Sequence, residues 1–235
     1  MHRVVEPSIL YFGTPVVLIS TRNEDGSINV SPMSSAWWLG WSCMIGLAGV
    51  SKTTENLLRE QECVLNLPSV DQAEAVNGLA KTTGSDPVPA SKLGRGYRHV
   101  KDKLGIAGLN ALSSEFVRAP RVAECPVQME AVLQARHPFG GFAAQRAYGD
   151  DLKTAAIMAL ELKIVRVHVE EELLLDGKEN HINSDLWKPL IMSFANFYGL
   201  ADGRVVSSKL AEIPEEQYRP AAHMGDARQA GAASE

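Results

Sequence analysis

Residues 15–31 read PVVLISTRNEDGSINVS and carry the clearest fold signal in the chain. A run rich in β-branched residues, Pro15–Thr21, precedes the turn sequence Asn23–Gly26, and Ser27–Ser31 then alternates polar and apolar residues. Glycine accepts the positive φ that a tight turn demands, so an Asp-Gly pair between two such runs is typical of a β-hairpin. We therefore predict two antiparallel strands near the start of the chain.

The pattern outside this hairpin predicts a mainly β protein with flanking helices. Apolar runs and period-two alternation indicate further strands at residues 41–48, 63–67, 125–133 and 160–169. Good helix formers behind capping hydroxyls indicate a helix over 53–62, and a second short helix is expected over 71–79. No internal repeat divides the chain.

The composition fits one sizeable globular domain. The 235 residues include 23 Lys and Arg against 28 Asp and Glu, for a net charge of -5, and 45% are hydrophobic. This mild acidity gives no global reason to bind nucleic acid or an anionic membrane, so an anionic ligand requires a local cluster of donors. Residues 26–51 carry no charge, but Asn29, Pro32 and several serines divide them, which favours two buried strands joined by a polar turn over a membrane span.

The cysteines predict neither disulfides nor a metal site. Cys43, Cys63 and Cys125 form no CxxC pair and lack zinc-ligand spacing, so we expect small buried hydrophobic side chains in a reducing cytoplasm. The sequence after Met1 lacks the layout of a signal peptide. A cytoplasmic location is the expectation.

Two segments lack a periodic pattern. Residues 81–112 are dense in Gly, Pro and Ser and hold a local positive excess: Lys81, Lys92, Arg95, Arg98, Lys101 and Lys103. Such a stretch is either a solvated loop or a lid over a phosphorylated ligand. Residues 213–235 are expected to form a polar tail that is poorly ordered or wraps a partner.

The segment with the most potential ligand-binding groups is Val50–Glu55, VSKTTE, between a predicted buried strand and a predicted helix. Free backbone N–H groups and the positive end of the helix dipole meet three hydroxyls and a lysine there, which suits a phosphate monoester. Plain capping of the helix by Ser51 or Thr53, with Lys52 in solvent, explains the same residues equally well.

A second stretch, Asn29–Trp37, mixes small residues and hydroxyls with an exposed aromatic at the edge of the predicted sheet. A flat heteroaromatic ring could lie along such a backbone. The two stretches together suit a ligand with a ring at one end and a phosphate at the other.

These motifs resemble the flavin reductase-like family of FMN-binding split barrels, in its flavoredoxin-like branch. The sequence has NVSPMS at 29–34, SKTTENLLR at 51–59 and ECVLNLP at 62–68, where the family has Asn-x-Ala-Pro-x-Ser, Lys-Asp-Thr-x-x-Asn and Phe-Val-Val-Asn. The similarity is good over residues 10–70, weak at 122–130 and 160–200, and absent over 81–112.

The resemblance implies a six-stranded antiparallel Greek-key barrel over residues 1–212. It also implies a homodimer with FMN at the subunit interface and NADH or NADPH as electron donor. By the matching positions, the isoalloxazine and ribityl chain would lie along Ser34, Ser35, Ala36 and Trp37, and the phosphate would be held by Ser51, Lys52, Thr53 and Thr54. Ala36, Trp37 and Leu162 depart from the family's usual residues, which bears on the flavin face.

Hydride transfer from a nicotinamide to flavin N5 needs no obligatory acid or base, so one histidine is a candidate for a supporting role. His181 lies in the C-terminal region that approaches the flavin in relatives, where it would bond a flavin oxygen or donate a proton. Alternatively, His181 has only a structural role in the fold. For His168 we expect a position on the surface or at an interface.

The leading functional hypothesis is an NAD(P)H-dependent flavin reductase that supplies reduced flavin to a partner monooxygenase or reduces a small molecule. One alternative keeps FMN tightly bound and uses residues 81–112 and 187–198 as a pocket for a dedicated organic substrate. Another is a non-enzymatic FMN electron carrier. A pyridoxamine-phosphate oxidase relative ranks lower because its Arg- and Lys-rich phosphate signature is not evident.

Overall fold

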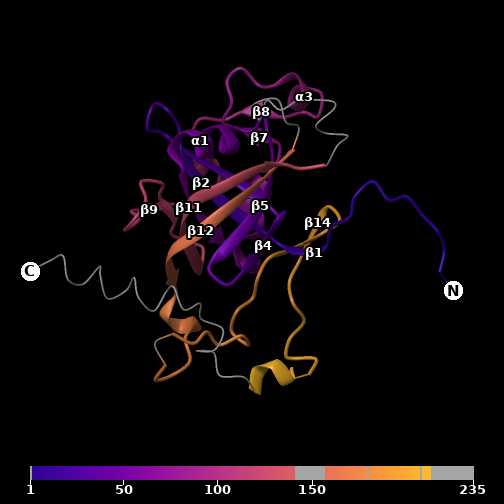
Figure 1. The fold of residues 1–235 in the computed structure, drawn as a ribbon, viewed down its shortest axis with the longest axis vertical. Helices are drawn as coiled ribbons and strands as arrows, with labels where there is room; N and C mark the ends of the chain where they lie inside the picture. The colour runs from indigo at the N-terminus through magenta and orange to yellow at the C-terminus, as the bar shows by residue number, and fades with distance from the viewer. Residues whose placement is uncertain (1, 141–156, 179, 207, 213–235) are drawn as a thin grey trace, which may run out of the picture.

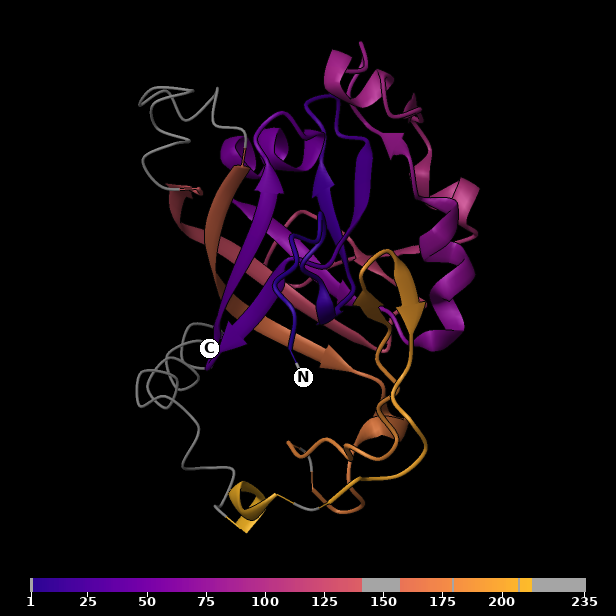
Figure 2. The same ribbon diagram turned by 90° about the vertical axis from the view of Figure 1, so that its right-hand side faces the viewer.

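The computed structural model describes residues 2–140, 157–178, 180–206 and 208–212, and a seven-stranded antiparallel sheet forms its centre (Figures 1 and 2). The sheet order is β3-β2-β6-β11-β12-β5-β4. The strands are β2 (Val17–Arg22), β3 (Ile28–Met33), β4 (Ala36–Leu39), β5 (Ser42–Ala48), β6 (Glu62–Leu67), β11 (Val127–Pro138) and β12 (Ile157–Val169).

Smaller sheets and short helices surround this sheet. Three strands pair in the order β1-β13-β14, and two further pairs are β7 with β8 and β9 with β10. Their bounds are β1 (Phe12–Pro15), β7 (Thr82–Thr83), β8 (Arg98–His99), β9 (Ala111–Leu112), β10 (Arg121–Val122), β13 (Ile191–Ser193) and β14 (Asn196–Tyr198). The α-helices are α1 (Lys52–Glu60), α2 (Ala73–Gly78), α3 (Ala90–Leu93) and α4 (Lys103–Ala107), with 3-10 turns at Val70–Gln72, Glu171–Leu173 and Lys209–Glu212.

The predicted hairpin is confirmed as β2 and β3. Gly26 has a φ of +80° in the turn, and the Asn23 N–H donates to the Ser27 carbonyl at 2.8 Å. The two strands predicted within residues 26–51 are confirmed as β3 and β5, but a third strand, β4, lies between them. The one we missed, β4, is four residues long, with Trp37 and Leu39 exposed, and such a short edge strand leaves little period to detect.

The mainly β prediction is confirmed, but the seven-stranded sheet does not close into the expected six-stranded barrel within the described residues. The sheet ends at β3 and β4. The helices α1 and α4 pack against β3, so helices cover that end of the sheet instead of a closing strand.

Strand β2 is buried on both faces, which explains its continuous apolar run. Val17 and Ile19 face a core formed with β5, β6, β11, β12 and Leu57 of α1. Leu18 faces a second core that includes Val76 of α2 and Leu104 of α4. Burial on both faces removes the alternation expected of a strand with one wet side.

The three cysteines are free and buried, as predicted. Burial raises the pKa of the Cys43 thiol to about 12. Burial likewise raises the pKa values of Cys63 and Cys125. All three therefore stay protonated thiols at neutral pH.

The prediction that residues 81–112 lack regular structure is wrong. They form β7, α3, β8, α4 and β9, and Leu104 and Leu109 are buried in the second core. These elements are two to five residues long, which is too short for hydrophobic periodicity to show. The predicted tail at 213–235 lies outside the described residues.

His168 is tied into the protein by a buried carboxylate. Its Nε2 lies 2.7 Å from Oε1 of Glu130, a fully buried residue of β11. The same carboxylate accepts the backbone N–H groups of Glu115, Phe116 and Val117. Burial opposes ionisation of Glu130, but these hydrogen bonds hold its pKa below the usual value. Glu130 thus fastens the 115–117 loop to the sheet.

Among the described residues, no helix has both the length and the apolar character needed to cross a membrane.

Candidate functional site

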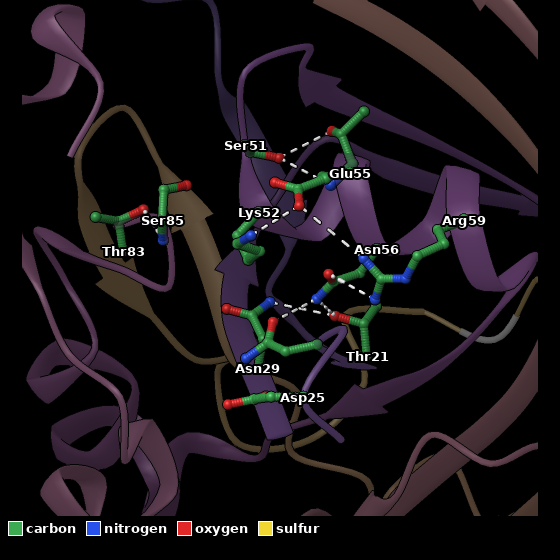
Figure 3. Close-up of polar contacts among 12 residues, drawn as sticks. Thr21, Asp25, Asn29, Ser51, Lys52, Glu55, Asn56, Arg59, Thr83 and Ser85 are labelled. Carbon is green, nitrogen blue, oxygen red and sulfur yellow. Dashed lines mark hydrogen bonds and ion pairs between the residues drawn. The ribbon is translucent and has the colours of Figure 1, made fainter. Parts of the chain in front are cut away.

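The start of α1 directly follows the end of β5, and Ser51 caps it. Ser51 Oγ accepts the Thr54 N–H at 3.1 Å and lies 2.8 Å from Thr54 Oγ1, which donates to the Ala48 carbonyl at 2.8 Å (Figure 3). Thr54 is fully buried. The hydroxyls of Ser51 and Thr54 are therefore occupied within the chain, as the capping interpretation predicts.

Lys52 and Thr53 leave donors open at the same helix start. Their backbone N–H groups have no hydrogen-bond acceptor in the part of the chain that the structure describes. The Lys52 ammonium is 2.8 Å from Glu55 Oε1, and its side chain is 21% exposed. A partly exposed pair at this spacing is weak, so the ammonium can turn toward an anion at small cost. The helix dipole favours negative charge at this point.

A buried amide network fixes α1 on the β2–β3 hairpin. Asn29 Nδ2 donates to Thr53 Oγ1 at 3.1 Å and to Thr21 Oγ1 at 3.2 Å. From the helix, Asn56 Nδ2 donates to the same Thr21 oxygen at 3.0 Å and to Asn23 Oδ1 at 2.8 Å (Figure 3). These bonds hold the first turn of α1 against β3 and join the two predicted stretches.

The predicted ring-binding residues span the link from β3 to β4. Ser34 and Ala36 are buried, and Ser35 Oγ lies 2.7 Å from the Tyr11 hydroxyl. The Ser35 carbonyl accepts the Gly46 N–H at 2.8 Å, which holds the link against β5. Trp37 is 57% exposed, so it alone of the four presents a large side chain to solvent.

His181 lies in a different part of the molecule. It follows β12, and its carbonyl accepts the Leu175 N–H at 2.8 Å beside a bridge between Leu174 and Ile182. The orange segment that follows β12 lies at the opposite end of the molecule from α1 in both views (Figures 1 and 2). Within one chain, the structure does not bring His181 to the helix start.

A pocket of about 300 Å³ opens where the hairpin, the start of α1 and the 84–103 segment meet. It is lined by Asn23, Glu24, Asp25, Ser27, Ile28, Asn29, Lys52, Gly84, Asp86, His99, Val100, Lys101 and Lys103. The sequence indicated the basic excess of 81–112 but not which of its side chains turn inward. No sequence signal singled out Lys103 or Gly84.

Lys103 is the most unusual residue of this pocket, because it is only 2% exposed. Burial, with a further contribution from Lys92, lowers the pKa of the Lys103 ammonium to about 8. Lys103 is therefore mostly charged at pH 7. It supplies a buried positive charge near the helix start.

Fold and site together define a mainly antiparallel β protein with a polar pocket beside the start of α1. Residues 9–199 match the model of the flavin reductase like domain, and the chain belongs to this family. The predicted family is thus confirmed.

Relatives of several kinds share the sequence or the fold. A Bacillus subtilis (strain 168) protein, described as the uncharacterized protein YdfE, is 38% identical over 197 residues, or 83% of this chain and 88% of that protein. Flavoredoxin of Desulfovibrio vulgaris superposes with a TM-score of 0.68 at 18% identity, covering 90% of this chain and 98% of that chain. Nitrilotriacetate monooxygenase component B from Bacillus cereus gives a TM-score of 0.64 at 22% identity, covering 85% and 89%. At these identities the two solved structures establish the fold.

Proposed function

We propose that this protein is an FMN-binding, NAD(P)H-dependent flavin reductase. Membership of the flavin reductase-like family makes it a flavin reductase-type oxidoreductase. The observation that carries the finer proposal is the hydrogen bond from Asn29 to Thr53, since it joins the stretch expected to border a flavin ring to the helix start expected to hold a phosphate.

The start of α1 offers donors for the phosphate of FMN, but these are a lysine and backbone N–H groups rather than the three hydroxyls of the motif. Lys52 and the open N–H groups of Lys52 and Thr53 supply donors with a favourable dipole. The hydroxyls of Ser51, Thr53 and Thr54 serve chiefly to shape this turn, because each already has a partner in the chain. The backbone from Ser34 to Trp37 would border the isoalloxazine ring.

When bound, FMN would supply the hydride-accepting ring, so that NAD(P)H and one proton yield NAD(P)⁺ and reduced flavin. The chain's task is then to orient the two rings and exclude water. Trp37 can cover one edge of a ring, and the Ser35–Gly46 hydrogen bond holds the adjoining backbone. We retain His181 as a proposed hydrogen-bond donor to the flavin, which a second copy of the chain would have to supply.

A homodimer with FMN at its interface is part of the proposal. Trp37 and Leu39 are 57% and 76% exposed on the edge strand β4. Phe12 and Phe194 meet edge to face, with ring centroids 4.8 Å apart, and both are exposed. Exposed large apolar side chains on a sheet edge favour burial against a second copy.

The product would be reduced flavin for a partner monooxygenase or a reduced small molecule. One structural neighbour is a monooxygenase component B, and another is the 2-nitrobenzoate 2-nitroreductase NbaA of Pseudomonas fluorescens. The second candidate function is a non-enzymatic FMN electron carrier, and the structural similarity to a flavoredoxin is the observation that favours it. We propose a cytoplasmic location for either function.

The test is the absorbance spectrum of the purified, dialysed protein with and without FMN, followed by NADH or NADPH under anaerobic conditions. Flavin bands that bleach with a nicotinamide support the reductase and identify its donor. Bands that appear but persist with both nicotinamides favour the carrier. Absence of flavin binding would refute both.

A further inference from the structure

A second pocket, with a volume of about 460 Å³, lies between the β2–β3 hairpin and residues 111–120, and we call it the Arg22 groove. It shares only Ile28 with the pocket at the start of α1. Its lining includes the arginines Arg22 and Arg118 and the apolar side chains of Ile28, Leu112 and Val117. None of the described residues that line it is acidic, so its electrostatic character depends on how the two arginines are compensated.

The guanidinium of Arg22 is fixed in place by two backbone carbonyls. Its Nε donates to the Arg118 carbonyl at 2.6 Å, and its Nη1 donates to the Gly26 carbonyl at 2.9 Å. Within the described residues, Arg22 makes no ion pair and its Nη2 has no hydrogen-bond acceptor. The side chain is half-buried, so water screens its charge only in part. An arginine held this way has a fixed orientation but no counter-ion.

Arg118, by contrast, is already compensated. Its Nε lies 3.2 Å from Glu62 Oε1, and its Nη2 pairs with Glu60. Glu60 also lies 2.7 Å from Nε of Arg59. Two arginines and two glutamates therefore balance one another beside the groove. Arg22 is the charge that this network leaves without a counter-ion, which favours an anion beside it.

The other walls of the groove are apolar and fixed. Ile28 is half-buried, Val117 is buried and Leu112 is exposed. The segment that carries Val117 is tied to the sheet, because the Val117 N–H donates to the buried Glu130 carboxylate at 3.1 Å. The groove is thus formed by the chain alone, without a ligand. Apolar walls with one oriented polar group are typical of a small-molecule site.

We propose that the Arg22 groove binds a small organic carboxylate, with Arg22 holding the carboxylate and Leu112, Ile28 and Val117 contacting an apolar body. The planar guanidinium matches the two oxygens of a carboxylate. Such an ion carries one charge, which a single uncompensated arginine balances. A phosphate monoester favours several donors, as at a helix start.

The groove is a site separate from the proposed reaction. Ile28 begins β3, whereas Ser34–Trp37, the link proposed to border the flavin ring, follows the end of this strand. A strand rises about 3.3 Å per residue, so roughly 20 Å separates Ile28 from Ser34. The inference therefore does not rest on the proposed function.

The test measures binding of hexanoate, hexanol and inorganic phosphate to the full chain by calorimetry. The wild type should bind hexanoate more tightly than hexanol. Arg22→Met should weaken hexanoate binding about tenfold and leave hexanol binding unchanged, as expected for losing a charge-assisted hydrogen bond. Arg98→Met is the matched control, because Arg98 is exposed and lines neither pocket, and it should bind hexanoate like the wild type. Benzoate and benzyl alcohol repeat the comparison with an aromatic body.

A second variant covers the case in which Arg22→Met does not fold. Leu112→Glu keeps Arg22 and its two backbone hydrogen bonds, and the site is exposed enough to accept the change. The new carboxylate would pair with Arg22 and should also weaken hexanoate binding about tenfold. Leu112→Gln, a neutral side chain of the same length, should retain most of the binding.

Three results would overturn the proposal. Equal binding of hexanoate and hexanol would show an apolar groove in which the charge of Arg22 plays no part. Phosphate bound more tightly than hexanoate would show an inorganic anion site. Absence of hexanoate and benzoate binding at millimolar concentration would show no carboxylate site. Each of these results leaves the flavin spectrum of the protein, and hence the proposed reductase, unaffected.

Discussion

Asn29 Nδ2 lies 3.1 Å from Thr53 Oγ1, and this hydrogen bond joins the middle of the β2–β3 hairpin to the first turn of α1. Asn29 is 1% exposed, and its carbonyl oxygen faces the backbone of Gly84. One amide therefore contacts all three segments that border the pocket. Its Nδ2 donates to Thr53 of the helix and to Thr21 of β2, and its Oδ1 faces Gly84.

Replacing Asn29 with Asp should reduce FMN affinity about tenfold while changing riboflavin affinity much less. The two side chains have nearly the same shape, but a carboxylate beside the helix start repels a phosphate. Fluorescence titration of each flavin checks this. Asn56→Asp is the control, since Asn56 belongs to the same network but does not line the pocket. Equal losses for FMN and riboflavin would contradict the prediction.

Lys103→Met should raise stability at pH 7. The Lys103 pKa is about 8 in the folded protein and 10.5 without the fold, a difference worth about 3 kcal/mol. Between these two pH values the unfolded chain binds the extra proton, so wild-type stability rises with pH there. The advantage of Lys103→Met should therefore be full below pH 8 and shrink toward pH 10.5. Urea unfolding at several pH values measures it, and a destabilised variant at pH 7 would argue against a cost of burying this charge.

Gly84→Ala should weaken phosphate binding without unfolding the protein. The added Cβ would lie 2.7 Å from Asn29 Oδ1, so the 82–85 segment must move away from α1. We expect a stability loss of about 1–3 kcal/mol, as for other overpacking changes. Calorimetry with inorganic phosphate and a thermal melt measure both effects. Gly26→Ala is the control, because Gly26 has a positive φ but open space around a Cβ. This variant should lose stability through backbone strain without crowding the pocket.

Glu130→Gln should cost about 3 kcal/mol at pH 7, because an amide has one acceptor oxygen and no charge, whereas both carboxylate oxygens accept N–H groups here. The pKa of Glu130 is lowered in the fold, so its contribution is present above the ordinary value of 4.5 and is lost as pH falls further. The gap between wild type and variant should close in acid. Glu115→Gln, on the exposed partner of Arg166, should show a much smaller gap. A gap independent of pH would exclude the charge as its cause.

Leu39→Lys should convert the proposed dimer into monomers. Leu39 is exposed on β4, where a buried lysine would be costly at an interface. Light scattering should give twice the 25.5 kDa chain mass for the wild type and the single mass for the variant. Leu93→Lys on α3 changes another exposed leucine and should leave the mass unchanged. A monomeric wild type would refute the dimer.

Sequence predicted the hairpin, α1 and the long strands because each has a local signal: a turn glycine, capping hydroxyls or a regular period. It also predicted that a helix starts just after Ser51, and the structure shows Ser51 capping it. It did not predict that Thr53 and Thr54 are buried, because their partners Asn29 and Ala48 become neighbours only through folding. The burial of Lys103 could not be predicted either, because nothing in the sequence distinguishes it from the other five basic residues of 81–112.

The thiols of Cys43, Cys63 and Cys125 lie in the cores as protonated groups. Reduced flavin reacts with dioxygen to give hydrogen peroxide, so a flavin reductase works beside an oxidant of its own making. Peroxide attacks the exposed thiolate far faster than the buried thiol. If the protein is a flavin reductase, this arrangement would protect its cysteines from oxidation during turnover in air.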